Sequence, residues 1–280
     1  MLVVEKIIEN ALAEDIGDGD HTSMATIPEG LKGRAQLLVK EDGILCGIPV
    51  AEKVFHMVDP GLQLEIFLQD GAVIKKGDVV FKVTGLIVSI LNAERLVLNF
   101  MQRLSGIATA THRMVQQVKG LSSQILDTRK TTPGLRELEK YAVVIGGGQN
   151  HRMGLFDMIM IKDNHVDYAG GIVPAIEAVH DHLTKTGKQL KIEIEVRNLD
   201  ELMQVLDHGR VDRIMLDNFP LDVMKKAIGL VNGRCETEAS GGIDEGNVRA
   251  YAETGVDFIS IGALTHHIKS LDLSLKAVMI

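Results

Sequence analysis

The 280-residue sequence predicts an α/β protein with two parts, a β-rich N-terminal part and a C-terminal part built on a parallel sheet. From Gly33 to about Gly85, short apolar runs alternate with turn residues, which is typical of a small sheet. After residue 120, six short apolar runs are each followed by a helical pattern. This alternation indicates βαβ repeats and favours either an open doubly wound sheet or a small α/β barrel.

Composition limits the class of protein. Hydrophobic residues make up 45% and charged residues 24% of the chain, as in soluble globular domains, which argues against disorder. The net charge of −8 disfavours nonspecific nucleic-acid or membrane binding, because both need summed positive charge. Cys46 and Cys235 lack zinc-ligand spacing, and no apolar run reaches the roughly 20 residues of a membrane span. The acidic start is unlike a signal peptide, so we expect a reduced cytoplasmic protein.

The N-terminal part begins with an amphipathic helix over 3–14, whose apolar residues recur at helical spacing. One further helix, over 51–58, interrupts the strand-length runs. A long helix over 92–119 connects the two parts, with Asn92 as its N-cap and Gly106 as a bend. A terminal helix is expected to end the chain.

Polar residues follow every predicted strand of the C-terminal part. The residues just past the six apolar runs are Asp127 to Lys130, Lys162 to Asn164, Glu195, Asp217 and Asn218, Ser240 to Gly242, and Gly262. Barrel enzymes build their sites at the carboxyl ends of their strands. The pattern therefore favours a barrel, and no GxGxxG follows a strand as a Rossmann fold would require.

Basic side chains near these strand ends are candidate anion ligands. Arg129 and Lys130 suit a carboxylate or phosphate; the alternative is that they form only a basic turn without a ligand. His151 and Arg152 follow the glycines 146–148, which permit close approach of a ligand or unusual backbone angles; a simple connector is the alternative. Lys162 follows a buried strand and is expected at the barrel mouth unless it is an ordinary surface lysine.

Carboxylates and glycines complete the candidate site. Glu195 and Asp217 suit magnesium, sugar hydroxyls or a developing positive charge, and Glu195 is preferred to Glu193 because it is nearer the strand end. The segments 240–243 and 261–267 occupy positions where barrels commonly bind phosphate.

Long motifs carry a resemblance to a known family. DTRKTTPGLR, GGGQNHRMGLFDMIMIKDNH, MLDNF, EASGGI and ISIGALTH, preceded by EDIGDGDHTS and NAERLVLNFMQRLSGIAT, resemble quinolinate phosphoribosyltransferase over nearly the whole chain. The resemblance implies a type II phosphoribosyltransferase: an N-terminal α/β sandwich domain over 1–112 and a C-terminal incomplete α/β barrel over 113–280, with the last helix packing back on the first domain. It also implies a homodimer with shared active sites, and leaves higher assembly open.

The resemblance further implies the reaction and the roles of residues. Quinolinate and phosphoribosyl pyrophosphate would give nicotinate mononucleotide, pyrophosphate and CO2, with Mg²⁺ held mainly through the pyrophosphate, near Glu195 and Asp217. The quinolinate carboxylates would meet Arg129, His151, Arg152 and Lys162, with Arg95 of the partner subunit. Lys130 would face the pyrophosphate, Lys162 both ligands, and Glu195 and Asp217 the ribose. The 5′-phosphate would meet Ser240, Gly241, Gly262 and His266.

Three alternatives remain at this point. A ModD-like paralogue associated with molybdenum transport shares the fold but is expected to lack GGGxNHR and IKDNH. Nicotinate phosphoribosyltransferase binds one carboxylate, for which the cations Arg95, Arg129, Arg152 and Lys162 are too many. A non-catalytic anion binder would be expected to lose acidic or lysine site residues, which are retained here. One departure from the family pattern is Val144 and Ile145, where a basic residue is common.

Overall fold

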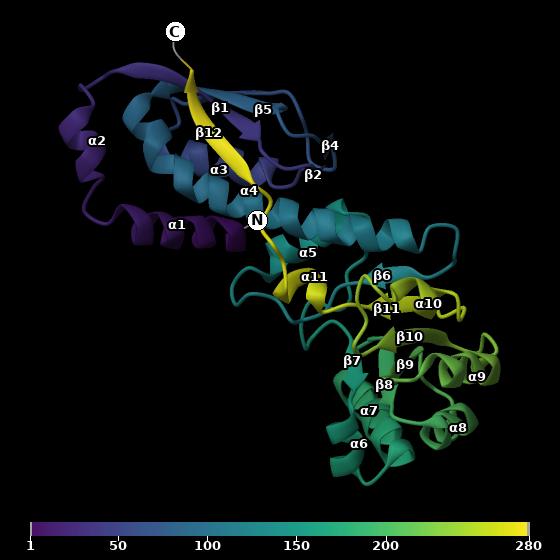
Figure 1. The fold of residues 1–280 in the computed structure, drawn as a ribbon. Coiled ribbons are helices and arrows are strands. Elements are labelled where there is room, and N and C mark those ends of the chain that lie inside the picture. Colours follow the sequence, from purple (N-terminus) through teal and green to yellow (C-terminus); the bar gives the residue numbers. More distant parts are fainter. Residues whose placement is uncertain (1, 279–280) are drawn as a thin grey trace. The chain divides into compact units, whose positions relative to one another are not determined.

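The computed structural model describes residues 2–278, which fall into two compact units (Figure 1). The first unit comprises the chain up to residue 112 together with 131–147 and the segment from 264 onward; the second comprises 113–130 and 148–263. The units thus differ from the simple division into 1–112 and 113–280. The two later segments join the first unit because a helix and the last described strand pack there.

The first unit holds both sheets and helices. Its elements in chain order are α1 (Leu2–Ile16), α2 (His21–Thr26), β1 (Lys32–Val39), β2 (Gly43–Ile44), α3 (Ile48–Val58), β3 (Gln63–Ile66), β4 (Val73–Ile74), β5 (Val79–Leu86), α4 (Ile87–Gln117, which continues into the second unit), α5 (Arg136–Ile145), α11 (Ala263–His266) and β12 (Leu273–Val278).

The main sheet of the first unit is antiparallel, in the order β12-β1-β5-β3. Buried apolar residues of α3 and β5 form part of its core, where the rings of Phe55 and Phe81 meet edge to face with centroids 5.8 Å apart. This arrangement confirms the predicted α/β sandwich. The helices predicted over 3–14 and 51–58 are found as α1 and α3.

The long connecting helix differs from the prediction at its start. α4 begins at Ile87, directly after β5, so Asn92 lies inside the helix and is not its N-cap. The buried side chain of Ile90 belongs to the same apolar face as later residues, which explains the earlier start. α4 is also unbroken through Gly106. A Cβ at Gly106 would collide with the backbone oxygen of Lys269, so this glycine permits close packing of two segments.

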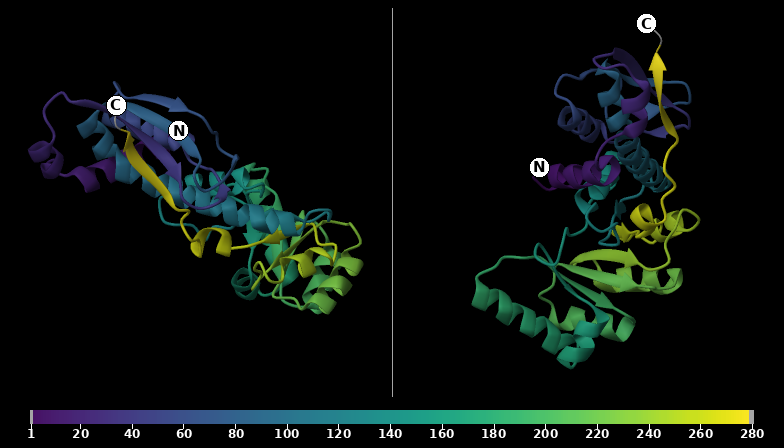
Figure 2. Two further views of the ribbon diagram at one scale, coloured as in Figure 1. Left: turned by 45° about the horizontal axis from the view of Figure 1, so that its top comes forward. Right: turned by 90° about the vertical axis from the view of Figure 1, so that its left-hand side faces the viewer.

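The last described element is a strand, where a terminal helix was predicted. After the short helix α11, β12 pairs antiparallel with β1 (Figure 2). In this pairing Leu273 lies opposite Val39 and Val278 opposite Arg34. The side chains of Leu273 and Leu275 are buried. The apolar alternation therefore serves one face of a sheet, and the last element belongs to the first unit, as a strand and not as a helix.

The second unit alternates strands and helices. Its elements are β6 (Gln124–Leu126), β7 (Ile159–Ile161), α6 (Asp163–Ala169), α7 (Ile172–Thr186), β8 (Ile192–Val196), α8 (Leu199–His208), β9 (Arg213–Asp217), α9 (Leu221–Val231), β10 (Glu236–Ser240), α10 (Val248–Ala252) and β11 (Phe258–Ser260). All six predicted strands are present.

The six strands form one parallel sheet in the order β6-β11-β10-β9-β8-β7. From β7 to β11 each strand pairs with the next one in sequence, so the chain winds in one direction as in a barrel and does not reverse as in a doubly wound sheet. Within residues 2–278, β7 and β6 do not pair, so the barrel is incomplete, as predicted. No helix in this described range is both long and apolar enough to cross a bilayer.

Candidate active site

One cavity of about 570 Å³ collects most of the predicted site residues, and all of its lining belongs to the second unit. It is lined by Thr128, Arg129, Lys130, His151, Arg152, Met160, Lys162, Asp163, Asn164, Glu195, Met215, Asp217, Glu238, Ser240 and Ser260. These residues come from the carboxyl ends of the parallel strands and from the segment around His151. The strand-end prediction therefore agrees with where the cavity lies.

The segment carrying His151 is fixed to the end of β6. The fully buried carboxylate of Asp127 accepts a hydrogen bond from the backbone N–H of His151 (2.8 Å). The backbone N–H of Asp127 in turn donates to the carbonyl of Gln149 (3.1 Å). Gly147 before it has φ of +94°, the left-handed region that favours glycine. The glycines thus serve the turn of the backbone that brings His151 beside β6.

Arg129 and Arg152 place two guanidinium groups at the same cavity. Burial lowers the pKa of Arg152, and the like charge of Arg129 lowers it further. Like charges gathered in one partly buried place cost free energy, which an anionic ligand would recover. The pair therefore favours a carboxylate or phosphate between or beside them.

Lys162 and Glu195 face each other across the ends of β7 and β8. Nζ of Lys162 lies 3.5 Å from Oε2 of Glu195, and the lysine side chain is 46% exposed whereas the carboxylate is 10% exposed. Burial raises the pKa of Glu195; Lys162 opposes this rise, and the neighbouring charge of Asp217 adds to it. Glu195 lines the cavity while Glu193 is fully buried beneath it, which agrees with the preference for Glu195.

Asp217 and Ser240 end two paired strands and lie opposite each other in the β9–β10 register. Nδ2 of Asn218 donates to Oδ2 of Asp217 (2.6 Å), and the backbone N–H of Asn218 donates to the carbonyl of Ser240 (2.8 Å). Gly241 has φ of +96°, and a Cβ there would collide with the Asn218 side chain. Gly241 thus leaves room for the amide that orients Asp217.

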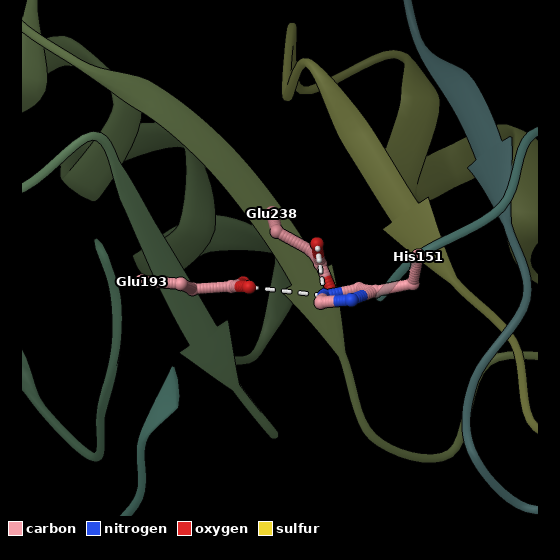
Figure 3. A group of neighbouring side chains, drawn as sticks. All are labelled: His151, Glu193 and Glu238. Atoms are coloured by element: carbon pink, nitrogen blue, oxygen red, sulfur yellow. Dashed lines mark ion pairs between the residues drawn. The ribbon is translucent and has the colours of Figure 1, made fainter. Parts of the chain in front are cut away.

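Beneath the cavity, His151 meets two carboxylates that come from β8 and β10, the strands on either side of β9 (Figure 3). Its Nε2 lies 2.9 Å from Glu193 of β8 and 3.4 Å from Glu238 of β10; the imidazole is 4% exposed and both carboxylates are fully buried. Arg213 of β9 donates to Glu238 (2.9 Å). Burial opposes protonation of the imidazole, but the hydrogen bonds and charges of the two carboxylates outweigh it and raise the His151 pKa to about 9.

His151, Glu193 and Glu238 also have the composition of a metal site, with their ligand atoms within 4.8 Å of one another. Arg213 argues against that use, because its guanidinium already neutralises Glu238 and would repel a divalent cation beside it. Burial and the charge of Glu238 also raise the pKa of Glu193, so counting Arg213 as +1 and each glutamate as −1, one proton shared between His151 and Glu193 makes the buried group neutral. We therefore interpret this group as an ion cluster that holds His151 in place.

Four predicted residues do not line this cavity. Arg95 is exposed on α4 and His266 is exposed in α11, both in the first unit. Gly241 adjoins the lining residue Ser240, and Gly262 follows β11.

The buried charges of the strand interiors are functional candidates that sequence reasoning missed. Glu238 lines the cavity, and Arg213 pairs with it from the adjacent strand. Both sit two or four residues before a strand-end residue, Ser240 and Asp217 respectively, so they share its face of the sheet. Charged residues at this spacing inside a parallel strand were the signal that could have identified them.

The fold and the site together define an α/β enzyme of the barrel type, in which four basic side chains and four carboxylates line a cavity at the strand ends. The chain belongs to the quinolinate phosphoribosyl transferase family. The model of the family's N-terminal domain matches residues 20–105, and that of its C-terminal domain matches residues 107–276.

Similar proteins cover almost the whole chain. A Nicotiana glauca protein named quinolinate phosphoribosyltransferase (decarboxylating) 1 is 49% identical over 285 residues, which span 96% of this chain and 81% of the relative. An Arabidopsis thaliana protein named nicotinate-nucleotide pyrophosphorylase (carboxylating), chloroplastic, is 48% identical over 288 residues, spanning 98% and 82%. The solved nicotinate-nucleotide pyrophosphorylase from Francisella tularensis superposes with a TM-score of 0.93 at 41% identity, covering 99% of this chain and 96% of that one.

Proposed function

We propose that this enzyme transfers the phosphoribosyl group of phosphoribosyl pyrophosphate to quinolinate and releases CO2, giving nicotinate mononucleotide and pyrophosphate for NAD biosynthesis. Membership of the quinolinate phosphoribosyl transferase family supports the reaction. The observation that carries it is the cavity in which Arg129, Lys130, Arg152 and Lys162 converge, in a protein whose net charge is −8. An acidic protein needs such a local group of cations to hold two polyanionic substrates, and here it lies beside the carboxylates of Asp163, Glu195, Asp217 and Glu238, which line the same cavity.

Quinolinate carries two adjacent carboxylates on a pyridine ring, and we assign them to Arg129, His151, Arg152 and Lys162. Guanidinium groups bind carboxylates through two parallel hydrogen bonds, so Arg129 and Arg152 supply orientation as well as charge. His151 lines the floor of the same cavity, where its Nε2 faces Glu193 and Glu238 and its Nδ1 accepts from the backbone N–H of Arg152. Arg95 of the partner subunit is proposed to complete this half of the site.

Phosphoribosyl pyrophosphate is assigned to the other side of the cavity. Lys130 would meet the pyrophosphate, and Glu195 and Asp217 the ribose hydroxyls. Ser240, Gly241, Gly262 and His266 would hold the 5′-phosphate, since strand-end glycines leave backbone N–H groups accessible. The orientation of Asp217 by Asn218 supports its role, because a fixed carboxylate stabilises charge without reorganising during the reaction.

The chemistry follows from positioning and charge. The pyridine nitrogen forms a bond to C1′ of the ribose as the bond from C1′ to pyrophosphate breaks. Positive charge develops on the ribose, where Glu195 and Asp217 are favourable. The bond to the adjacent carboxylate then breaks and CO2 leaves; the electron pair stays on the ring carbon, is stabilised by the quaternised nitrogen, and takes up a proton. Lys162, which contacts Glu195, would stay near both substrates throughout.

Mg²⁺ is proposed as the cofactor. The carboxylates of Glu195 and Asp217 are hard oxygen donors at the cavity, which fits this ion, but Lys162 already engages Glu195. This arrangement supports an ion that is held mainly through the substrate pyrophosphate, with the protein carboxylates nearby. When bound, Mg²⁺ would neutralise the leaving group.

We further propose a homodimer with shared active sites in the cytoplasm. Large apolar side chains are exposed in the second unit, with Leu155 at 72% and Phe156 at 70% just before the edge strand β7 in sequence, and Tyr168 at 91% in α6 just after it. A partner subunit covering them would remove apolar surface from water. Arg95, exposed on α4, is available to a partner. Both cysteines are free thiols, which supports a reducing compartment.

The test is an assay of the purified protein with quinolinate, phosphoribosyl pyrophosphate and Mg²⁺, following nicotinate mononucleotide and CO2 together. Equal amounts of both products from quinolinate are expected. Nicotinate serves as the control substrate, since it has one carboxylate and cannot release CO2 in the same way. Turnover of nicotinate in place of quinolinate, or product without CO2, would contradict the proposal. Light scattering of the same sample reports the number of subunits.

A further inference from the structure

A partly buried ion pair in the first unit joins two of its helices. Arg103 of α4 donates through Nε and Nη2 to Oε1 of Glu139 in α5, at 2.8 and 2.6 Å. The side chain of Glu139 is fully buried, and that of Arg103 is 29% exposed. Two short hydrogen bonds to a buried carboxylate make this a rigid contact.

The same pair holds two loop segments. Oε2 of Glu139 accepts from the backbone N–H of Thr132 (3.1 Å), and Nη2 of Arg103 donates to Oγ1 of Thr132 (2.7 Å). Nη2 also donates to the backbone carbonyl of Thr265 (3.1 Å). We call Arg103, Glu139, Thr132 and Thr265 the Arg103 junction. It binds together α4, α5 and two stretches of chain that are far apart in sequence.

Two members of the Arg103 junction, Thr132 and Thr265, lie close in sequence to the points where the chain passes between the two units. The chain passes from the second unit to the first between 130 and 131 and again between 263 and 264. Thr132 and Thr265 are each the second residue after such a passage. Lys130 lies two residues before Thr132, and His266 directly follows Thr265. Both neighbours are assigned above to phosphoribosyl pyrophosphate.

We propose that Arg103 and Glu139 are positioning residues for phosphoribosyl pyrophosphate, acting through Thr132 on Lys130 and through Thr265 on His266. The inference rests on the proposed function, because the roles of Lys130 and His266 come from it. Arg103 and Glu139 do not line the cavity. They would act by limiting how far two ligand-bearing segments can move.

Stability alone is a poor reason for this arrangement. A buried ion pair often contributes no more than a well-packed apolar pair would, because both charges lose their hydration. An apolar pair could join α4 to α5 equally well. It could not bind the N–H of Thr132 or the carbonyl of Thr265, and those contacts are what the charged pair adds.

The experiment compares substrate constants in three variants. Arg103→Lys keeps the charge but cannot reach all the acceptors at once, because lysine has a single terminal nitrogen. Thr132→Val removes one hydrogen bond and keeps the shape of the side chain. The double variant Arg103→Met with Glu139→Met leaves no buried charge unpaired. Gln102→Leu is the matched control, because Gln102, the neighbour of Arg103 on α4, donates through Nε2 to the carbonyl of Leu273 (2.8 Å) and makes no hydrogen bond to Thr132 within the described part of the chain.

For Arg103→Lys and the double variant we expect the KM for phosphoribosyl pyrophosphate to rise about tenfold or more, with the KM for quinolinate within about twofold of the original. Thr132→Val should show a smaller rise of the same kind. Gln102→Leu should lower the melting temperature and leave both constants unchanged. Titration calorimetry of phosphoribosyl pyrophosphate with Mg²⁺ should show the same ranking of affinities without any turnover.

Equal rises in both KM values, or unchanged binding of phosphoribosyl pyrophosphate in the folded double variant, would overturn the positioning role. If Arg103→Lys and the double variant do not fold, Thr132→Val decides: unchanged affinity for phosphoribosyl pyrophosphate would then overturn it. A failure of the proposed function can be told apart from a failure of the positioning role. If the original protein does not turn over quinolinate, the activity assay shows that the proposed function is wrong. Calorimetry with phosphoribosyl pyrophosphate still tests the Arg103 junction, because it needs no turnover.

Discussion

Replacing Glu193 by glutamine is expected to change how the stability of the protein depends on pH. Glutamine keeps the size of the side chain and removes the charge that lies 2.9 Å from Nε2 of His151. Neither oxygen of Glu193 has another hydrogen-bond donor among the described residues 2–278, so the change acts mainly through the imidazole. Glu238 keeps its contacts to His151 and Arg213.

The size of the stability change follows from the pKa of His151. A rise from 6.5 to about 9 equals roughly 3 kcal/mol of extra stabilisation of the imidazolium in the folded state. One contact opposes protonation: the backbone N–H of Arg152 donates to Nδ1 of His151 (2.7 Å), which requires that nitrogen to be unprotonated. Losing one such hydrogen bond costs about 1 kcal/mol, less than the two carboxylates supply.

The linkage between protonation and folding determines whether the contribution of His151 to stability rises or falls with pH. Because folding raises the pKa of His151, its contribution is complete below about pH 6.5, the unfolded value, and is lost as the pH rises through about 9. The original protein should therefore lose roughly 3 kcal/mol of unfolding free energy from this group across that window. With one of two carboxylates removed, Glu193→Gln should lose about half as much.

Urea unfolding at several pH values from 6 to 9.5 measures this difference. The matched control is Glu177→Gln, which removes the carboxylate from another His–Glu pair, where Glu177 lies 2.9 Å from His208 and is 46% exposed. The control should keep the original pH dependence. Parallel stability curves for Glu193→Gln and the original protein would refute the inference that Glu193 stabilises a protonated His151.

Three further outcomes are expected. Lys162→Ala should abolish decarboxylating transfer while leaving the circular dichroism spectrum unchanged, because the side chain is half exposed at a strand end; near-normal activity would contradict its role. Mixing equal amounts of Arg95→Ala and Lys162→Ala subunits should restore about a quarter of the original activity, because half the dimers are hybrids with one complete site; confirmed hybrids without activity would exclude shared sites. Gly106→Ala should destabilise the protein by about 1–3 kcal/mol in urea unfolding, since its Cβ would collide with the backbone of Lys269, and an unchanged midpoint would contradict that packing.

The sequence predicted the second unit best, for a physical reason. Strands of a parallel sheet end at one edge, so the polar residues after each apolar run had to come close together, and Lys162, Glu195 and Asp217 do. What lay inside the strands was harder to predict. Glu238 and Arg213 sit in runs that read as buried strands, and only their pairing across β9 and β10 explains charges there.

Elements that depend on distant pairing were predicted least well. The segment 273–278 has no strand partner near it in sequence, and local pattern alone suggested a helix; its partner is β1, near the other end of the chain. The start of α4 was misplaced for a similar reason, because Asn92 is a good helix cap in isolation, whereas the buried face of the helix begins earlier. Gly106 likewise made sense only once Lys269 was seen against it.

The pairing of β12 with β1 has a consequence for how the chain is synthesised. A ribosome releases β1 long before it releases β12, the strand that covers the edge of β1. Until then β1 presents unpaired backbone groups, a surface on which nascent chains can join one another. Truncation before Leu273 would make that state permanent, so the loss of β12 should reduce soluble yield far more than its short length suggests.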